Sequence, residues 1–286
     1  MTVTVERRFV AVPAGTVHCA VAGEGNPVLL LHQTPRSWDE YRDVLPLLGR
    51  QRRAIAMDTM GFGDSSRLPD GENTIESWAG VVVSLLDALA IERAAIVGHH
   101  TGGYVATEVA AAHPERVRAL VLSSVSLHSE EERSGRASGR TVVDDVDPVL
   151  DGSHLLKLWR GRAAFYPPST ELLRRFMVDC LRARDLAAEG HRVVARYAIE
   201  ERLPQVRCPV LVIGATADPY AYPSLPKLRA ALPHLVVTEI AGGMVPLPDQ
   251  LPEAFAAAVE TFLDSLDRDH SVGQLEDSAG PPDRHE

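Results

Sequence analysis

The stretch Gly98-His99-His100-Thr101-Gly102-Gly103 directly follows the apolar run Ala94-Ala95-Ile96-Val97. It has the form of a nucleophile elbow, a sharp turn from strand to helix that presents one side chain at the top of a sheet. The middle position of this pattern ordinarily holds serine, cysteine or aspartate. Here it holds His100, so the sequence keeps the turn and changes the residue that the turn presents.

Around this turn, short apolar runs alternate with segments of helical period. The runs have the pattern of strands buried on both faces and lie at 28–31, 54–57, 94–97, 117–123, 210–213 and 235–240. Helices are predicted over 37–48, 75–89, 104–112 and 253–266, and a hairpin over 8–21. Strands that alternate with helices at this spacing indicate an α/β fold with a mainly parallel sheet.

The alternation is interrupted after Leu127. Residues 129–140 are charged and rich in glycine and serine, which predicts a loop, and 154–165 and 170–198 predict helices with no strand between them. The predicted organisation is a core at 1–127 and 205–268, a helical cap insertion at 128–204 and a disordered tail at 269–286.

The composition limits the partners. A formal net charge of −10 argues against nucleic acid, whose phosphates would be repelled. No stretch approaches the ~18 apolar residues of a membrane span, and residues 1–12 lack the pattern of a signal peptide, so a cytoplasmic protein is expected. The scattered cysteines predict no metal site, and the lack of a nucleotide-binding loop predicts no cofactor. The preference for arginine over lysine indicates a bacterial, high-GC gene.

Five segments carry a family resemblance, in the order in which that family places an oxyanion loop, a D-x-x-G-x-G-x-S loop, the nucleophile, the acid and the histidine. They are Leu29–Gln33, Asp58–Ser65, Gly98–Gly103, Gly214–Pro219 and Gly242–Pro246. On these residues the chain resembles an α/β-hydrolase-fold protein, over about 8–127 and 205–266. The resemblance implies a hydrolase core with a cap, and it does not fix the reaction.

The resemblance also implies a catalytic triad in which only the acid is retained. In the ordinary mechanism a histidine deprotonates a serine while an acid orients that histidine. Asp218 stands at the acid position, His100 at the nucleophile position and Met244 at the histidine position. A thioether accepts no proton at neutral pH, so Met244 cannot act as a general base. A single change from histidine to methionine would produce this pattern at 244.

His100 is itself suited to acid/base chemistry. At an elbow it lies at the N-terminus of a helix, where the dipole disfavours positive charge and favours the neutral imidazole. The imidazole is longer than a serine side chain, so it is long enough to reach the volume of the missing histidine and contact Asp218. We therefore predict a catalytic dyad of His100 and Asp218.

Further residues are assigned to binding or to structure. The backbone N–H groups of Gln33 and Thr101 are the expected oxyanion donors, although Gln33 fits a solvent-facing loop residue equally well. Met244 is expected to pack against substrate or to fill the empty space. Four residues are expected to be structural: His32, His99, Asp58 and Asp64.

Two classes of function fit these residues. The first is a cofactor-independent enzyme acting on a small, fairly apolar organic substrate between core and cap. The resemblance implies ester or lactone hydrolysis, whereas elimination, cyclisation or C–C lyase chemistry fits the altered residues better because it needs no acyl-enzyme. A cap histidine could replace the missing base; the candidates for lining the pocket are His128, His154, His191, Trp159, Tyr166 and Tyr197. The second class is a catalytically degenerate protein that binds a ligand or a partner, and the oligomeric state is left open.

Overall fold

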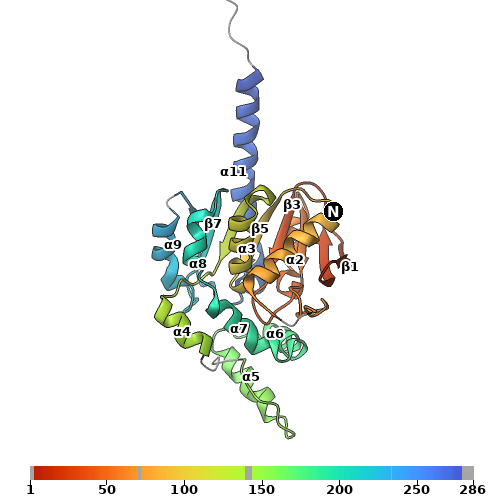
Figure 1. Ribbon diagram of the computed structural model, residues 1–286, viewed down its shortest axis with the longest axis vertical. Coiled ribbons are helices and arrows are strands. Elements are labelled where there is room, and N and C mark those ends of the chain that lie inside the picture. Colours follow the sequence, from red (N-terminus) through yellow and green to blue (C-terminus); the bar gives the residue numbers. More distant parts are fainter. Residues whose placement is uncertain (1–2, 70–71, 139–143, 233, 279–286) are drawn as a thin grey trace, which may run out of the picture.

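The computed structural model describes residues 3–69, 72–138, 144–232 and 234–278, and an eight-stranded sheet forms its centre (Figure 1). The strands lie in the order β1-β2-β4-β3-β5-β6-β7-β8. Their bounds are β1 (Val5–Val12), β2 (Gly15–Ala22), β3 (Pro27–Leu31), β4 (Arg53–Met57), β5 (Ala94–His99), β6 (Val117–Ser123), β7 (Val210–Ala215) and β8 (Val236–Ile240). The pairs β1–β2 and β2–β4 are antiparallel and all other neighbours are parallel, which confirms the predicted α/β class.

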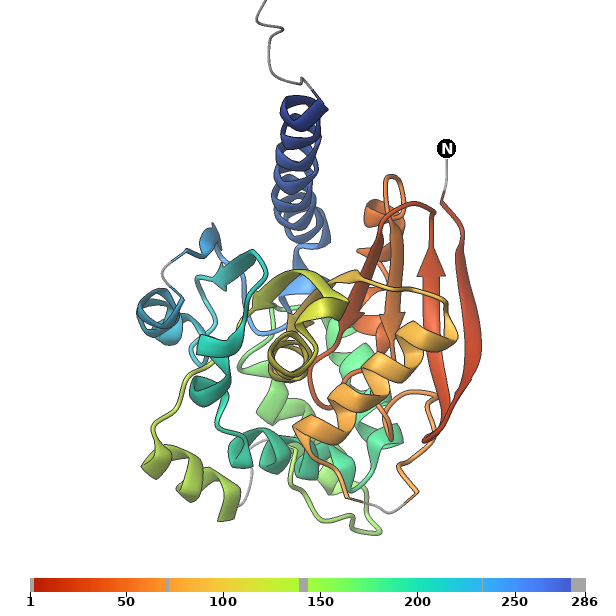
Figure 2. The ribbon, with the colours of Figure 1, turned by 45° about the horizontal axis from the view of Figure 1, so that its top comes forward.

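Helices cover both faces of the sheet because the central strands are apolar on both sides. Leu29 and Leu31 of β3 belong to the apolar cluster that includes α2 and α3, whereas Val28 and Leu30 belong to the cluster that includes α1 and α11. Figure 2 shows α2 and α3 side by side. The core helices are η1 (Trp38–Tyr41), α1 (Leu45–Leu48), α2 (Ile75–Ala88), α3 (Thr101–Ala112), η2 (Pro114–Arg116), η4 (Tyr222–Ser224), α9 (Leu225–Ala231), α10 (Leu247–Gln250) and α11 (Pro252–Ser278).

Between β6 and β7 the described residues form helices and no strand. These helices are α4 (Glu130–Ser138), α5 (Ser153–Ala163), α6 (Thr170–Ala183), α7 (Leu186–Arg196), α8 (Ile199–Arg202) and η3 (Leu203–Gln205). Helices α4–α7 gather at one end of the molecule, and α11 protrudes at the opposite end (Figure 1). We refer to α4–α8 as the cap.

Three local predictions were wrong, each for an identifiable reason. The charged residues of 129–138 form α4, because three glutamates in its first turn and Arg136 in its last turn suit the helix dipole; residues 139–143 lie outside the described part. The helix predicted over 170–198 is interrupted at Arg184, whose φ is 55°. The helix predicted over 37–48 divides into η1 and α1, because Pro46 has no N–H to continue one helix.

The C-terminal prediction also needs correction. Helix α11 continues through Ser278, so the tail predicted at 269–286 begins within a helix. Residues 279–286 lie outside the described residues. Among the described residues, no helix combines the length and apolarity needed to cross a bilayer.

Buried ion pairs join the cap to the core. Arg36, which has no exposed surface, donates through Nε to Oδ2 of Asp179 on α6 at 2.8 Å and also contacts Asp249. In return, Arg175 of α6 donates through Nε to Oδ2 of Asp39 at 2.7 Å. Burial lowers the pKa of Arg36, but the surrounding carboxylates outweigh this and raise it well above its usual value. Arg36 therefore stays charged, and its charge is compensated from both sides of the junction.

The close approach of α3 to β3 makes Gly102 irreplaceable. A Cβ added there would lie 2.0 Å from the carbonyl oxygen of Leu31. We expect Gly102→Ala to lower the free energy of unfolding by about 3 kcal/mol, because the backbone must shift. Gly80→Ala on α2, where an added Cβ meets nothing within 4 Å, should instead raise it by up to about 1 kcal/mol. Urea unfolding of both variants checks this; equal stability would contradict the close approach.

Candidate active site

His100 stands at the turn between β5 and α3, and its backbone is strained. Its φ and ψ are 45° and −113°, a region that residues with a Cβ rarely adopt. Such a conformation costs of order 1–3 kcal/mol and persists only where the surrounding structure enforces it. Here the His100 N–H donates to the carbonyl oxygen of Ser123 at 2.9 Å, and Gly98 and Gly102 allow strand and helix to meet. Backbone strain of this kind is typical of a functional residue whose side chain is held in one direction by the surrounding structure.

The structure brings His100 and Asp218 together. Nε2 of His100 lies 2.9 Å from Oδ2 of Asp218, whose side chain is fully buried, while the His100 side chain keeps 18% of its surface exposed. The two groups are not oriented for a hydrogen bond, so they make a close polar contact. It leaves Nδ1 as the imidazole nitrogen available to a ligand.

The environment of Asp218 keeps its carboxylate ionised. Burial raises the pKa of Asp218, but the adjacent His100 and two backbone donors outweigh this and lower it to about 2. The donors are the N–H groups of Tyr220 and Ala221, at 2.9 and 3.1 Å from Oδ1. Asp218 therefore presents a fixed negative charge to His100 at neutral pH.

The oxyanion loop differs from the prediction. Gln33 is buried, which excludes a solvent-facing loop residue, and its backbone N–H donates to Oε2 of Glu40 at 2.9 Å. Its side-chain amide donates to the same carboxyl group at 2.5 Å. Because these donors are engaged, the expected role of the Gln33 N–H in an oxyanion site does not match this geometry. Burial raises the pKa of Glu40 to about 8.

Thr34 follows Gln33 along the loop, and its backbone N–H also has an acceptor within the protein. The backbone N–H of Thr34 lies 3.2 Å from Oγ1 of Thr101, the first residue of α3. The first N–H groups of a helix have no partner within it, so the Thr101 N–H is left for another acceptor. Thr34 and Thr101 both line the cavity described below.

Met244 is half-buried, and it is not one of the described residues that line the cavity. Its backbone N–H donates to Oε1 of Gln250 at 2.7 Å, and the Gln250 amide donates to Gly242, which closes this turn. Val245 lines the cavity instead. Packing of Met244 against a substrate therefore has no support in this geometry.

A cavity of about 360 Å³ lies above His100, with walls from both core and cap. It is lined by Gln33, Thr34, His100, Thr101, Tyr104, Ser126, His128, Arg136, Arg162, His191, Val194, Ala195, Tyr220 and Val245. Of the six cap residues considered from sequence, His128 and His191 are among these. Most of these residues carry a polar group, while Val194, Ala195 and Val245 are apolar. Sequence reasoning missed Arg136 and Arg162 because helical spacing alone does not show which charged face meets the core.

Of the four residues predicted to be structural, His32, His99 and Asp58 are buried and Asp64 is half-buried. His32 bonds the carbonyl oxygen of Gln33 through Nδ1 at 2.8 Å and accepts from the Thr59 N–H at 3.0 Å, which confirms its role in steadying the loop. His99 lies behind His100, between the Ser123 hydroxyl and the Val245 carbonyl oxygen. Burial lowers the pKa of His99 well below its usual value, so it is neutral.

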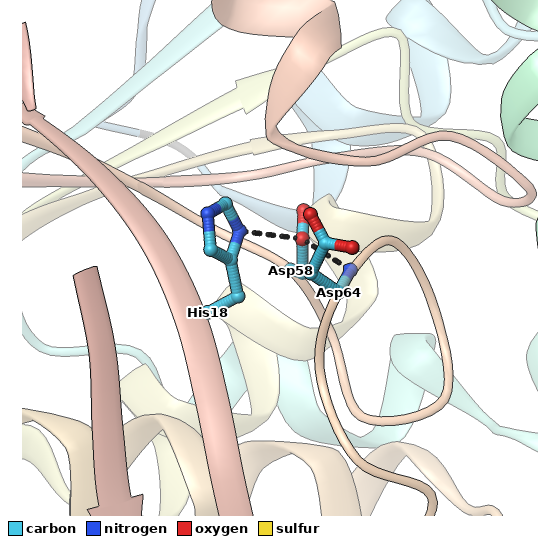
Figure 3. A group of neighbouring side chains, drawn as sticks. All are labelled: His18, Asp58 and Asp64. Atoms are coloured by element: carbon cyan, nitrogen blue, oxygen red, sulfur yellow. Dashed lines mark hydrogen bonds and ion pairs between the residues drawn. The ribbon is translucent and has the colours of Figure 1, made fainter. Parts of the chain in front are cut away.

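His18, Asp58 and Asp64 form a cluster with the spacing of metal ligands (Figure 3). Their atoms are already used by the protein. Oδ2 of Asp58 accepts from His18 Nδ1 and from the Asp64 N–H, both at 2.8 Å, as predicted for a residue that ties loop amides. The Asp64 carboxylate instead contacts Arg7 and Arg182, and Arg7 also donates to His18 Nε2. The cluster is thus a structural junction.

The sequence matches the profile of a known protein family. The sequence profile described as alpha/beta hydrolase fold matches residues 26–249. The chain belongs to this family. Its fold is also similar to the crystal structure of a hydrolase from Pseudomonas aeruginosa PA01, with a TM-score of 0.75, 24% identity, and coverage of 90% of this chain and 98% of that one.

Curated relatives include hydrolases of several kinds. A 2-hydroxymuconate semialdehyde hydrolase from Pseudomonas sp. (strain CF600) is 42% identical over 104 residues, which are 35% of this chain and only 37% of that protein. Haloalkane dehalogenase 2 from Mycobacterium tuberculosis is 24% identical over 89% of this chain and 93% of its own length. The strongest local similarity thus spans little more than a third of those proteins' length. The reaction of this chain must therefore be argued from its own site residues.

The contact between His100 and Asp218 makes a testable statement about pH. Because the folded pKa of Asp218 is below the unfolded value of about 3.9, its ionised form stabilises the fold above about pH 4. This stabilisation is lost as pH falls through about 2. In His100→Gln the pKa of Asp218 should rise, so the loss should begin at higher pH. A ¹³C-NMR titration of the carboxyl group measures this, with His113→Gln as control; an unchanged midpoint would show that the backbone donors alone hold the charge.

Proposed function

We propose that this chain is a cofactor-independent enzyme that uses His100 and Asp218 as an acid/base pair on a small organic molecule. The observation that carries the proposal is the 2.9 Å contact between His100 Nε2 and the buried Asp218 carboxylate, at the floor of the cavity. An ionised partner on Nε2 favours the tautomer with the proton on that nitrogen. Nδ1 then faces the ligand as a base.

The chemistry follows from this tautomer. His100 Nδ1 removes a proton from the substrate, or from a water that attacks it, and Asp218 stabilises the imidazolium that forms. The electron pair moves onto a carbonyl oxygen of the substrate, where the Thr101 N–H stabilises the developing charge, with the Thr34 N–H as a second donor if it leaves the Thr101 hydroxyl. The imidazolium then returns its proton to the leaving group or to carbon. No acyl-enzyme is required.

Two reaction types share these steps. The names of the relatives support hydrolysis, since they are hydrolases and dehalogenases. The histidine at the elbow supports elimination, cyclisation or C–C cleavage, because this position offers no hydroxyl or carboxylate that would form the usual covalent intermediate. A covalent adduct detected by mass spectrometry after rapid quenching would favour His100 as a nucleophile over its role as a base.

The second candidate is a ligand-binding protein on a catalytically degenerate hydrolase fold. The residue that favours it is Met244, which replaces the usual base and lies outside the cavity lining. This reading predicts saturable ligand binding with no turnover.

Ester turnover separates the two candidates. With short-chain p-nitrophenyl esters, we expect His100→Ala to lower kcat/KM by about 100-fold or more, because the base is removed. His113→Ala, at the far end of α3 and partly exposed, should leave the rate unchanged. If the wild type turns over no ester and also fails in proton-exchange assays, the enzymatic proposal is wrong.

Position 244 gives a second prediction. Met244→His should raise ester turnover by less than about tenfold, because His100 still occupies the elbow and no serine is available as nucleophile. Steady-state kinetics of Met244→His beside the wild type measures this. A variant that is active while the wild type is inactive would instead show that this chain is a disabled hydrolase.

A further inference from the structure

The cavity presents positively charged donors to a ligand, although the chain as a whole has a formal net charge of −10. Its described lining includes Arg136 and Arg162 and no aspartate or glutamate. The nearby acids lie behind the wall, since the side chains of Asp144 and Asp218 have no exposed surface. A bound molecule therefore meets N–H groups and not carboxylates.

The guanidinium of Arg162 on α5 is fixed by its neighbours and keeps an N–H donor without an acceptor. Its Nη2 lies 2.7 and 2.5 Å from the two carboxylate oxygens of Asp144, which also pairs with His191 Nε2 at 2.6 Å. The guanidinium carbon lies 4.3 Å from the centre of the Phe176 ring, so the group is fixed on both sides. Among the described residues, Nε has no hydrogen-bond acceptor. Burial lowers the pKa of Arg162, but Asp144 outweighs this and raises it, which keeps the group charged.

Among the described residues, Arg136 on α4 supplies a positive charge without a paired carboxylate. Its Nη1 lies 3.0 Å from Nε2 of His128, a neutral acceptor whose pKa is lowered by burial and by the adjacent arginine. Within the described part of the chain, no carboxylate lies within ion-pair distance of Arg136. Since Asp144 balances Arg162, Arg136 adds a further guanidinium to the cavity wall.

We infer that the substrate carries a carboxylate, which Arg136 and Arg162 bind on the cap side of the cavity while His100 acts from the core side. The inference rests on the proposed function only in taking this cavity as the substrate site. Charge-assisted hydrogen bonds are about twice as strong as neutral ones, and arginine suits planar carboxylates. The cap thereby selects a small organic acid.

Binding of benzoate and benzamide tests this, because the two have nearly the same shape and differ in charge. By calorimetry on the full chain at pH 7.5, we expect benzoate to bind about tenfold or more tightly than benzamide. Arg136→Met, at an exposed position, should remove most of this preference. Arg162→Met should do the same, with Arg162→Lys as the alternative if loss of the Asp144 pair prevents folding. Arg160→Met, an exposed arginine on the same helix, is the matched control.

The outcomes separate this inference from the proposed function. Equal affinity for the two ligands, no measurable benzoate binding, or a preference that persists in both Arg136→Met and the folded Arg162 variant would overturn it. A protein that binds benzoate through these arginines but turns over no substrate would overturn the enzymatic proposal and leave the anion site standing.

Discussion

The geometry of the whole site depends on the absence of side chains at the elbow. A Cβ at Gly98 would lie 2.2 Å from the carbonyl oxygen of Gly102, and one at Gly102 would lie 2.0 Å from that of Leu31. Only glycine lets β5, β3 and α3 meet this closely. The close approach forces the strained backbone of His100, places the Thr101 N–H at the helix start and brings the loop with Thr34 beside it.

The local sequence pattern was sufficient to predict the structure where residues within a short segment decide it. The buried strands and the elbow follow from apolar runs and glycines, and the pairing of Asp218 with His100 follows from a motif order that places both at one edge of the sheet. It was insufficient where a distant partner decides. The Gln33 amide turns to Glu40, a contact that no spacing shows, and α4 forms from residues whose composition resembles a loop.

The site uses the same electrostatic arrangement twice. A buried carboxylate lies behind a side chain that lines the cavity: Asp218 behind His100, and Asp144 behind Arg162 and His191. Each acid orients its partner without facing a ligand. This explains how an acidic protein can offer a cavity whose described lining has no carboxylate, and why the composition alone gave no sign of it.

The position of α11 has a practical consequence. This helix leaves the body of the molecule at the end opposite to α4–α7 (Figure 1). The cavity wall is built by residues of the cap and of the loops that face it, whereas α11 contributes none of the described lining residues. An affinity tag, a fluorescent fusion or a surface linker attached to α11 would lie at the end of the molecule opposite α4–α7, away from the helices that help to line the cavity.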